Sequence, residues 1–596
     1  MKKTLRHIVS FICEQYLIVF FIITIGLKLS FLYFGVLKLN WWNNDINAGV
    51  LLGFIITAIL FSPLYFIRKH KNKYVILLAT LISFLILFDT VYYSYFSSLP
   101  TVGLLGNVGQ VTDVIPAING LFKWWFLLYF IDIFLIIITL RYMKSAIKKV
   151  KKRYNIRNSD FKTSLIVIFL TFFTCWLSIS SLGINKFFEV LERGYDTVST
   201  AHFYGVLAAH AFDLTRFINE STTWISKEEK QALSEWVTEH KPPQAVSNLN
   251  GIAKDKNLIM IQVESLGTLV IDQKINNKEI TPNLNSLVKI SHYFPNDLFL
   301  YGGGHSSDTD FVANTSYFPL NDSAAFVRYG RANYTSLPKL ITPNNYSTFA
   351  YHGFNRNFWN RDIAYKSLGY QKYYAADNYK KGEKINMGLS DDDFLLQTAD
   401  FIKKQPKPSL SYIITLTSHS PFNITGHKNN LNINIDDYPN QVGGYIENIH
   451  YTDYALGRFF DKLKSIGLYE DSLIVVYGDH TPVLSKFTAG TINYDPSSTQ
   501  SKEVPLLFKL PNTNVGKLYI NRGSHLDIMP TVLDLLGIKN SHLMFGQSLF
   551  VKENKEVINC PGKVSVFSGL GDCDSARNIE MQKSSTIIRY NQFNNL

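Results

Sequence analysis

The stretch Tyr301–Asp310, which reads YGGGHSSDTD, decides how the rest of this chain is interpreted. Three glycines lead into His305, Ser306 and Ser307, and glycine lets the backbone turn through positive φ and approach a bound group closely. A hydroxyl that follows such a turn, at the start of a helix, lies near free N–H groups and the positive end of the helix dipole. The stretch therefore predicts a nucleophilic serine, whereas the plain alternative is one of the many glycine-serine loops that carry no chemistry.

The length and composition exclude several classes of protein. The chain has 596 residues, of which 46% are hydrophobic, 18% are charged and only four are cysteines. This length exceeds that of a usual single domain, and so few cysteines exclude a scaffold built on disulfides. The charged share is low for a soluble protein. We therefore expect more than one domain and a membrane-embedded part.

Five apolar runs precede residue 185, each near the roughly 20 residues that a bilayer requires. They cover about Tyr16–Leu37, Ile46–Ile67, Tyr74–Phe96, Leu121–Leu140 and Ser164–Ile184. The first run is too long, and too poorly followed by a small-residue cleavage site, for a simple signal peptide. We therefore predict a five-helix transmembrane bundle over residues 1–184.

The basic residues of this first third lie on alternate sides of the runs. The N-terminus and the second and fourth connections hold sixteen Lys and Arg and two acids, whereas the first connection has one Lys and the third has none. Because Lys and Arg mark the cytoplasmic side, we expect a cytoplasmic N-terminus and a chain that is extracellular after the fifth run. The net charge of +12 is therefore a topology signal and predicts no nucleic-acid partner.

A few charged residues lie inside the apolar runs. They are Lys28, Asp89, Lys123 and Asp132. An ionisable residue within a membrane is a candidate for function, but a single acid that faces the interior of a bundle is often only tolerated there. Asp89 and Asp132 are therefore open candidates.

Residues 185–250 turn polar and helical, and we expect an amphipathic connector. Ser226 and Glu229 form a capping box that opens a helix, and Pro242-Pro243 ends it. From residue 251 to about 550, buried strands alternate with helices, which indicates a mostly parallel sheet covered on both faces. The expected strands are Asn257–Val263, Ser411–Thr417, Ser472–Tyr477 and Val504–Leu510. The expected helices are Thr281–Leu287, Tyr445–Ile466 and Ser524–Leu536.

Four candidate site residues follow the expected strands of this domain. Glu264, His419, Asp479 and His480 stand at carboxyl ends, where such sheets gather their ligands. Two carboxylates, an imidazole and the Ser306 hydroxyl form an oxygen and nitrogen set that suits Mn²⁺, Zn²⁺ or Mg²⁺, and the hard oxygen donors favour Mn²⁺ or Mg²⁺. A bound ion would lower the pKa of the Ser306 hydroxyl and withdraw charge from a phosphoryl oxygen. Taken singly, each residue has an ordinary explanation as a loop cap, a surface ion pair or core packing.

The order of five motifs resembles the lipoteichoic acid synthases, which are membrane phosphoglycerol transferases of the alkaline phosphatase and sulfatase superfamily. The motifs are NLIMIQVES at 257–265, GGGHSSDTDF at 302–311, HGFNRNFWNRD at 352–362, TSHSPF at 417–422 and VVYGDHTP at 475–482. The resemblance covers the five runs, the connector and the outer domain to about Leu549. It implies an N-terminal transmembrane bundle plus an extracellular α/β domain of alkaline phosphatase/sulfatase type, in the cell membrane of a Gram-positive-type envelope.

The resemblance also implies roles for eight residues. By matched motif, the residues that correspond to the family's ligands for one Mn²⁺ are Glu264, Ser306, Asp479 and His480. Mg²⁺ is a possible substitute for Mn²⁺, and Ser306 corresponds to the nucleophile. The residues that match those holding glycerol phosphate are His352, Trp359, Arg361 and His419.

The chemistry of the second set fits such a role independently. Arg361 offers a fork of donors to a phosphate, and Trp359 offers a flat apolar wall to a glycerol backbone, although core packing alone is common for a tryptophan. His352 and His419 would serve as proton donors to the leaving alcohol or as neutral hydrogen-bond donors.

Several positions depart from the family's pattern or lie outside it. The family's usual nucleophile is Thr, but Ser306 is a less hindered alcohol that can perform the same displacement, with Ser307 as the alternative. His525 is a further candidate ligand, and its place at a helix start favours capping or packing instead. The tail, residues 551–596, carries Cys560 and Cys573, whose pairing in an extracellular disulfide the sequence leaves open.

The resemblance implies phosphatidylglycerol as the donor and a glycolipid or a poly(glycerol phosphate) chain as the acceptor. A primase, or a phosphoglycerol or phosphoethanolamine transferase acting on another envelope glycan, would use the same site, and an inactive envelope scaffold is the alternative without catalysis. A sulfatase is disfavoured because it needs Pro and Arg two and four residues after its nucleophile, whereas SDTD follows Ser306. Acceptor identity, processivity, oligomeric state and proteolytic release of the outer domain do not follow from the sequence.

Overall fold

The computed structural model describes most of the chain between residues 10 and 593. Outside the described residues lie 1–9, 38–43, 68, 97–98, 103–122, 154–160, 183–199, 202–203, 223–224, 241–245, 301, 303, 321–322, 423, 425–430, 432, 435–436, 439–440, 485, 552–574 and 594–596. The predictions for Cys560 and Cys573 therefore fall outside the described residues. Those up to Thr222 form one compact unit, and those after it form a second.

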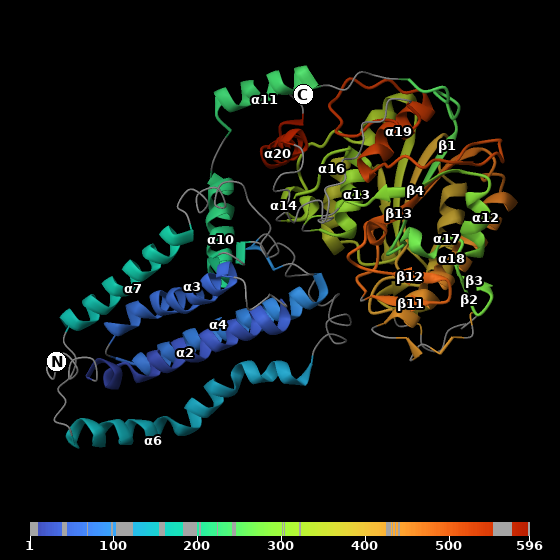
Figure 1. The fold of residues 1–596 in the computed structure, drawn as a ribbon. Helices are drawn as coiled ribbons and strands as arrows, with labels where there is room; N and C mark the ends of the chain where they lie inside the picture. Colours follow the sequence, from blue (N-terminus) through green and yellow to red (C-terminus); the bar gives the residue numbers. More distant parts are fainter. Residues whose placement is uncertain are drawn as a thin grey trace. The chain divides into compact units, whose positions relative to one another are not determined.

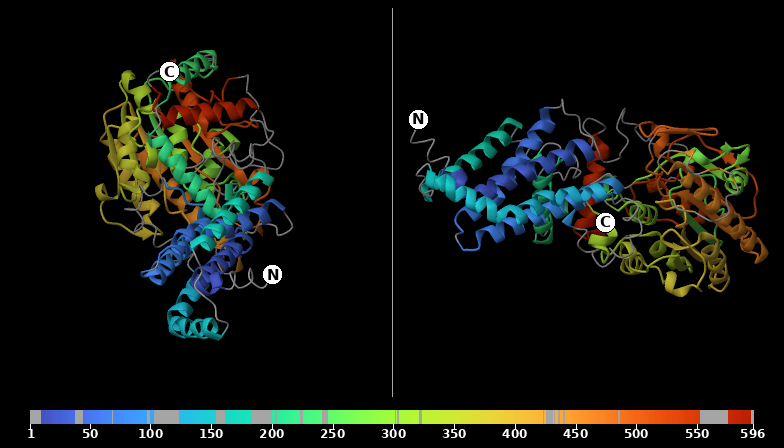
Figure 2. Two further views of the ribbon diagram at one scale, coloured as in Figure 1. Left: turned by 90° about the vertical axis from the view of Figure 1, so that its left-hand side faces the viewer. Right: turned by 90° about the horizontal axis from the view of Figure 1, so that it is seen from below.

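The first unit consists of apolar helices. They are α2 (Tyr16–Phe31), α3 (Asn44–Phe61), α4 (Lys71–Phe96), α6 (Ile131–Arg153), α7 (Phe161–Leu182) and α10 (Val206–Thr222). Helix α2 packs against α3 and α4, which are drawn in blue (Figure 1, Figure 2). Among the described residues, four segments are long and apolar enough to cross a membrane, namely Tyr16–Val36, Lys71–Ser94, Trp124–Lys152 and Phe161–Ser180.

These four segments correspond to four of the five predicted runs. The run predicted at Ile46–Ile67 appears as a shorter apolar stretch, Gly49–Tyr65, within α3 and the turn after it. The apolar helices are thus consistent with a transmembrane bundle, but the predicted count of five is not established.

Three of the four charged residues singled out in the apolar runs, Lys28, Asp89 and Asp132, have an ion-pair partner. The Nζ atom of Lys28 lies 2.7 Å from Asp132 Oδ1 and donates to Ser83 Oγ at 2.8 Å. Asp89 Oδ1 lies 3.0 Å from Nε2 of His210, on α10. The two acids singled out in the sequence therefore join α2 to α6 and α4 to α10 in the interior of the unit.

The second unit is built on an eight-stranded mixed sheet with the order β14-β4-β13-β10-β1-β9-β5-β6. Its central strand β1 (Asn257–Val263) is parallel to both neighbours, β10 (Ser472–Gly478) and β9 (Ser409–Ile414). The parallel part continues through β5 and β6, whereas β13 pairs antiparallel with both β10 and β4. The remaining bounds are β4 (His292–Leu298), β5 (Ser347–His352), β6 (Lys372–Tyr374), β13 (Glu503–Lys509) and β14 (Lys517–Leu518).

Helices cover both faces of this sheet, as the parallel strands require (Figure 1). Leu258 and Met260 of β1 pack into one hydrophobic cluster, and Ile259 and Ile261 pack into the other, because successive side chains of a strand point to opposite faces. The first cluster includes side chains of α13 (Ser306–Thr315), α16 (Arg361–Leu368) and α19 (Ile528–Leu536). The second includes side chains of α12 (Pro282–Val288), α17 (Asp391–Lys403) and α18 (Val442–Ser465). The predicted α/β fold is confirmed, with a mixed sheet.

The first and last helices of the second unit lie in segments that we predicted to be separate from the α/β domain. Helix α11 (Lys227–His240) begins at the predicted capping box, in which Glu229 N donates to Ser226 Oγ at 3.0 Å, and it buries Leu233 and Val237 in the first cluster. Helix α20 (Ser575–Arg589) buries Ile587 and Ile588 in the same cluster. The expected connector is thus divided, since α10 belongs to the first unit and α11 to the second.

Candidate active site

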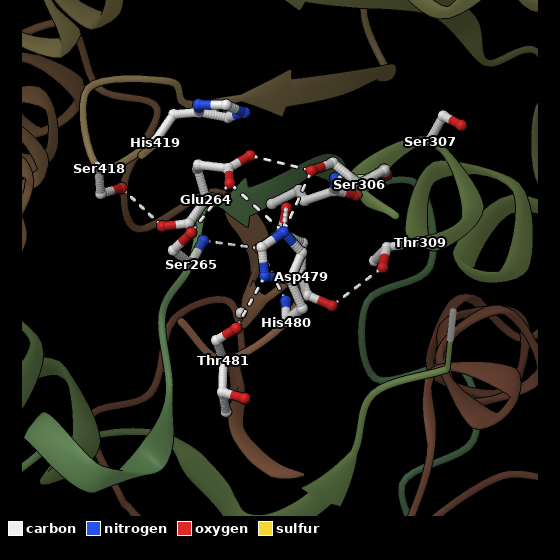
Figure 3. A network of polar contacts seen from close by, with 12 residues as sticks. Glu264, Ser265, Ser306, Ser307, Thr309, Ser418, His419, Asp479, His480 and Thr481 are labelled. Atoms are coloured by element: carbon white, nitrogen blue, oxygen red, sulfur yellow. Dashed lines mark hydrogen bonds and ion pairs between the residues drawn. The ribbon is translucent and has the colours of Figure 1, made fainter. Parts of the chain in front are cut away.

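Neighbouring strands bring two of the candidate acids together. Val263 is in register with Gly478 at the ends of the parallel strands β1 and β10, so the residues that follow them, Glu264 and Asp479, leave the sheet side by side. Ser306 is the first residue of α13 and faces the same place (Figure 3). Three distant segments of the chain therefore converge at one edge of the sheet.

The four predicted metal-site residues form one compact cluster (Figure 3). The Ser306 hydroxyl donates to Glu264 Oε2 at 3.0 Å, and Ser306 Oγ lies 3.3 Å from His480 Nε2. The same Nε2 lies 3.4 Å from Glu264 Oε1 and 3.6 Å from Asp479 Oδ2. Glu264, Asp479 and His480 each offer a ligand atom, and these atoms lie within 4.8 Å of one another.

Hydrogen bonds around the cluster fix which atoms face inwards. His480 Nδ1 donates to the carbonyl oxygen of Thr481 at 3.0 Å, which turns Nε2 towards the cluster. Asp479 Oδ1 accepts from the backbone N–H groups of Ser265 and His480, both at 2.7 Å. Its Oδ2 is buried and has no hydrogen-bond partner among the described residues. A buried carboxylate oxygen without a partner is costly, and a cation fits this set of donors.

The pKa shifts of the cluster residues also indicate a site for a cation. Burial and the nearby Glu264 raise the pKa of Asp479, as expected when two carboxylates share a site. Burial opposes ionisation of Glu264, but the charges of His419 and His480 lower its pKa overall. Burial also opposes the charge on His480, whereas Asp479 and Glu264 raise its pKa to about 10. The cluster therefore holds positive charge strongly, and a metal ion bound there would displace protons.

Hydrogen bonds from the turn before Ser306 to a residue of α13 stabilise that turn. Asp308 Oδ2 accepts from the backbone N–H groups of Gly302 and Gly304, at 2.7 and 2.8 Å. A Cβ atom at Gly304 would lie 2.5 Å from Asp308 Oδ1, so only glycine fits there. His305 adopts a positive φ of 44°, an uncommon conformation for a residue with a side chain. This turn aims Ser306 at the cluster.

Ser307, the alternative nucleophile, is turned elsewhere. Its hydroxyl donates to the carbonyl oxygen of Gly304 at 2.9 Å, and in Figure 3 it points away from Glu264 and His480. The geometry therefore favours Ser306.

His352 is the last residue of β5 and is buried. Its Nδ1 donates to the carbonyl oxygen of Ile414 at 3.1 Å, and Nε2 has no partner among the described residues. Burial and the charge of Arg361 lower the pKa of His352 to about 3, so the ring is neutral. Its free position is therefore a hydrogen-bond acceptor, which differs from the donor role expected from the sequence.

The other three predicted phosphate-site residues lie on loops or helix starts. Arg361 begins α16, is buried, and donates from Nε to Asp310 Oδ2 at 2.8 Å. Trp359 stands two residues earlier in a left-handed conformation, with φ of 54°, and packs beside Phe358. His419 lies beside Glu264 (Figure 3), and its Nδ1 donates to the carbonyl oxygen of Ser420 at 2.6 Å.

Several buried polar residues around the site were missed from the sequence. Asp391 accepts from the backbone N–H groups of Leu416 and Thr417, at 2.8 and 3.2 Å, and thereby holds the loop that carries His419. Asp310 and Gln262 contact Arg361 and the Ser306 backbone, respectively. Only Asp310 had a signal, since it follows Ser306 by four residues, a spacing that places both on one face of a helix.

His525, the further candidate ligand, is not part of the cluster. It is buried, and its Nε2 donates to the carbonyl oxygen of Gly478 at 2.9 Å. This agrees with the expected packing role, because the bond supports the strand end from which Asp479 leaves the sheet.

Comparisons with known proteins match both units. Residues 1–224 match the lipoteichoic acid synthase N-terminal domain, and residues 256–538 match the sulfatase domain. The lipoteichoic acid synthase of Staphylococcus aureus (strain USA300) is 30% identical over 562 residues, which cover 90% of this chain and 84% of that protein.

Two solved structures have related descriptions. The lipoteichoic acid synthase LtaP of Listeria monocytogenes is 28% identical, with a TM-score of 0.49 over 54% of this chain and 81% of that one. The phosphoglycerol transferase GacH of Streptococcus pyogenes is 18% identical, with a TM-score of 0.40 over 61% of this chain and 90% of that one. The identity and coverage shared with the staphylococcal protein, together with the two domain matches, show that the chain belongs to the lipoteichoic acid synthase family.

Proposed function

We propose that this protein transfers glycerol phosphate from phosphatidylglycerol to a glycolipid or poly(glycerol phosphate) acceptor, through a covalent intermediate on Ser306. Membership of the lipoteichoic acid synthase family supports the reaction class. The observation that carries the proposal is the position of the Ser306 hydroxyl, 3.0 Å from Glu264 Oε2 and 3.3 Å from His480 Nε2.

Glu264, Asp479 and His480, together with Ser306 Oγ, would hold one divalent cation. Their oxygen-rich donor set favours Mn²⁺, with Mg²⁺ as a substitute. When bound, the ion supplies positive charge that lowers the pKa of the Ser306 hydroxyl and stabilises the phosphoryl oxygens.

The chain's own residues perform two in-line displacements. Ser306 Oγ attacks the phosphorus of phosphatidylglycerol, the bond to the diacylglycerol oxygen breaks, and a glycerophosphoryl group remains on Ser306. A hydroxyl of the acceptor then attacks the same phosphorus, and the bond to Ser306 Oγ breaks. In both steps the site positions the groups and neutralises charge.

Four residues would hold the glycerophosphoryl group during these steps. Arg361 donates to phosphoryl oxygens, and Trp359 packs against the glycerol carbons. His352 Nε2, as an acceptor, binds a glycerol hydroxyl. His419 would serve as a proton donor to the leaving alcohol.

The proposal includes a location and a topology. Residues 1–184 form the multi-pass membrane anchor with a cytoplasmic N-terminus, and residues 251–550 act at the extracellular face, where the donor lipid lies in the outer leaflet. The apolar helices of the first unit and the alternation of basic connections support this arrangement.

Fluorescent phosphatidylglycerol, incubated with the full-length protein, tests the proposal. We expect Mn²⁺-dependent release of diacylglycerol, abolished by a chelator and reduced about a thousand-fold or more in Ser306→Ala. Ser307→Ala is the matched control and should keep most activity. Undiminished turnover by Ser306→Ala would remove Ser306 from its role.

The products of the same assay separate the remaining alternatives. A glycerol phosphate polymer indicates a synthase, and a single added unit indicates a primase. Absence of turnover together with absence of Mn²⁺ binding would instead indicate an inactive scaffold.

A further inference from the structure

We infer that Asp310 is a positioning residue for the transfer reaction, because it holds Arg361 by its Nε edge and aims the two terminal amino groups at the phosphoryl group attacked by Ser306. This inference rests on the proposed function. Among the described residues, the Asp310 side chain forms no hydrogen bond with Glu264, Asp479 or His480.

Asp310 and Arg361 form a buried ion pair. Their exposed fractions are 0% and 1%, and Arg361 Nε donates to Asp310 Oδ2 at 2.8 Å. A guanidinium without a partner at this depth would be strongly destabilising, so the carboxylate is what allows the charge of Arg361 to be buried beside the site.

The ion pair with Asp310 leaves the two terminal amino groups of Arg361 available to bind a phosphoryl group. Within the described part of the chain, Arg361 forms a single hydrogen bond, from Nε, and its terminal amino groups form none. Because the guanidinium is planar and rigid, holding it by Nε fixes the direction of both amino groups. Those groups are the ones that bind two phosphoryl oxygens side by side.

Three donors converge on the Asp310 carboxylate. Besides Arg361, the Tyr365 hydroxyl donates to Oδ2 at 2.8 Å and Gln262 Nε2 donates to Oδ1 at 2.8 Å. An asparagine at this position would turn an NH₂ group towards one of these donors. A carboxylate is therefore required by hydrogen bonding as well as by charge.

The same network contains the backbone of the nucleophile. Gln262 Nε2 also donates to the carbonyl oxygen of Ser306 at 3.2 Å, and Gln262 Oε1 accepts from the Tyr412 hydroxyl at 2.6 Å. Gln262 lies on β1, two residues before Glu264, and Asp310 lies one helical turn after Ser306 on α13. One buried network thus sets the position of Arg361 relative to both Ser306 and Glu264.

The test compares Asp310→Asn with wild-type protein, both full-length and loaded with Mn²⁺. We expect kcat/KM for phosphatidylglycerol to fall about 100-fold, as for other displacements of a catalytic group by about 1 Å. We also expect KM, and the Kd for sn-glycerol 1-phosphate measured by calorimetry, to rise, while the affinity for Mn²⁺ stays unchanged.

Asp453→Asn is the matched control. Asp453 is also buried, at 1% exposure, and accepts from Asn283 N, Asn283 Nδ2 and Leu284 N, at 3.0, 2.9 and 2.8 Å. It therefore reports the general cost of neutralising a buried aspartate, with activity retained. Equal kinetic constants for the two variants would overturn the inference.

A double-mutant cycle with Arg361→Lys separates positioning from a general structural role. If Asp310 acts through Arg361, the double variant loses no more activity than Arg361→Lys alone, whereas additive losses would contradict the inference. If Asp310→Asn does not fold, Tyr365→Phe replaces it, since this change removes one brace and keeps the charge. Tyr365→Phe should raise KM and the Kd for sn-glycerol 1-phosphate several-fold, and wild-type constants would overturn the inference. Failure of the wild-type protein to release diacylglycerol would instead reject the proposed function itself.

Discussion

Glu447 is a buried acid on α18 that has no assigned role in the reaction. It is 2% exposed, and its Oε1 has no hydrogen-bond partner among the described residues. Burial raises the pKa of Glu447 to about 7 from an ordinary value of 4.5, against an opposing effect of Lys278. Because the folded state holds the proton more tightly, protonated Glu447 stabilises the fold below about pH 4.5, and this contribution is lost as the pH rises through about 7.

Glu447→Gln should therefore be more stable than wild type at about pH 8, by about 1–2 kcal/mol, because it removes the cost of ionising a buried acid. The advantage should shrink on acidification and vanish near pH 4.5, where both side chains are neutral. Thermal unfolding of the full-length protein across this range measures it. The exposed Glu239→Gln serves as the control, and a pH-independent advantage of Glu447→Gln would contradict the prediction.

At the scale of residues, the sequence predicts which side chains gather at the candidate site better than it predicts the residues that hold them in place. Glu264, Asp479 and His480 could be found because each follows an apolar strand, and the strands' parallel register then brings them together. The role of Gln262 could not be found, since a polar residue inside an apolar strand carries no pattern that identifies its partner. The spacing of Asp310 from Ser306 places both on one face of a helix but does not identify Arg361 as the partner of Asp310. The acceptor role of His352 also depends on a carbonyl group, that of Ile414, which only the folded sheet supplies.

Among the elements, continuous apolar strands were predictable and interrupted ones were not. Strand β1 has the predicted bounds, Asn257–Val263. Strand β4 was missed because its sequence, HYFPNDL, contains Pro295, Asn296 and Asp297, which usually end strands. The proline is tolerated because it lies where the pairing of β4 with β13 shifts register, between Phe294 and Asp297, so no ladder hydrogen bond from its nitrogen is required.

Helix α20 and the turn after it form part of the outer domain's core, although the sequence placed the tail outside that domain. Phe593 is 1% exposed, and its ring lies 5.2 Å from that of Tyr317 and 5.1 Å from that of Tyr334. Phe593→Ala should lower the free energy of unfolding by about 3 kcal/mol, by loss of burial and creation of a cavity. Thermal unfolding measures the change, and Ile579→Ala, at a residue of α20 that is 43% exposed, is the control. Equal stabilities of the two variants would show that the tail is not part of the core.

The ion pair between α2 and α6 is a second element-scale feature that can be tested. Lys28→Met leaves Asp132 buried without its partner, so we expect a loss of stability of about 3 kcal/mol or more. The double variant Lys28→Met/Asp132→Leu removes both charges and should recover most of this loss. Unfolding of the full-length protein in detergent measures both. A double variant as unstable as the single one would show that the pair does not join these helices.

For the whole molecule, hydropathy and charge patterning indicated a membrane part followed by an α/β part, and the structure and the comparisons agree with that division. The number of crossings is not established, because the described part of the run predicted at Ile46–Ile67 is the apolar stretch Gly49–Tyr65, whereas the other four predicted runs contain segments long enough to span. The connector could not be divided from its sequence, since amphipathic helices such as α10 and α11 do not reveal which core receives their apolar face.

The central claim is that Ser306, placed among Glu264, Asp479 and His480, becomes covalently linked to glycerol phosphate. The most direct measurement is peptide mass spectrometry of full-length protein quenched in acid after incubation with phosphatidylglycerol and Mn²⁺, without acceptor. We expect the added mass of one glycerophosphoryl group on Ser306, and its absence in Ser306→Ala and in chelator-treated protein. Consumption of phosphatidylglycerol with no adduct on Ser306, or with the adduct on another residue, would contradict the claim.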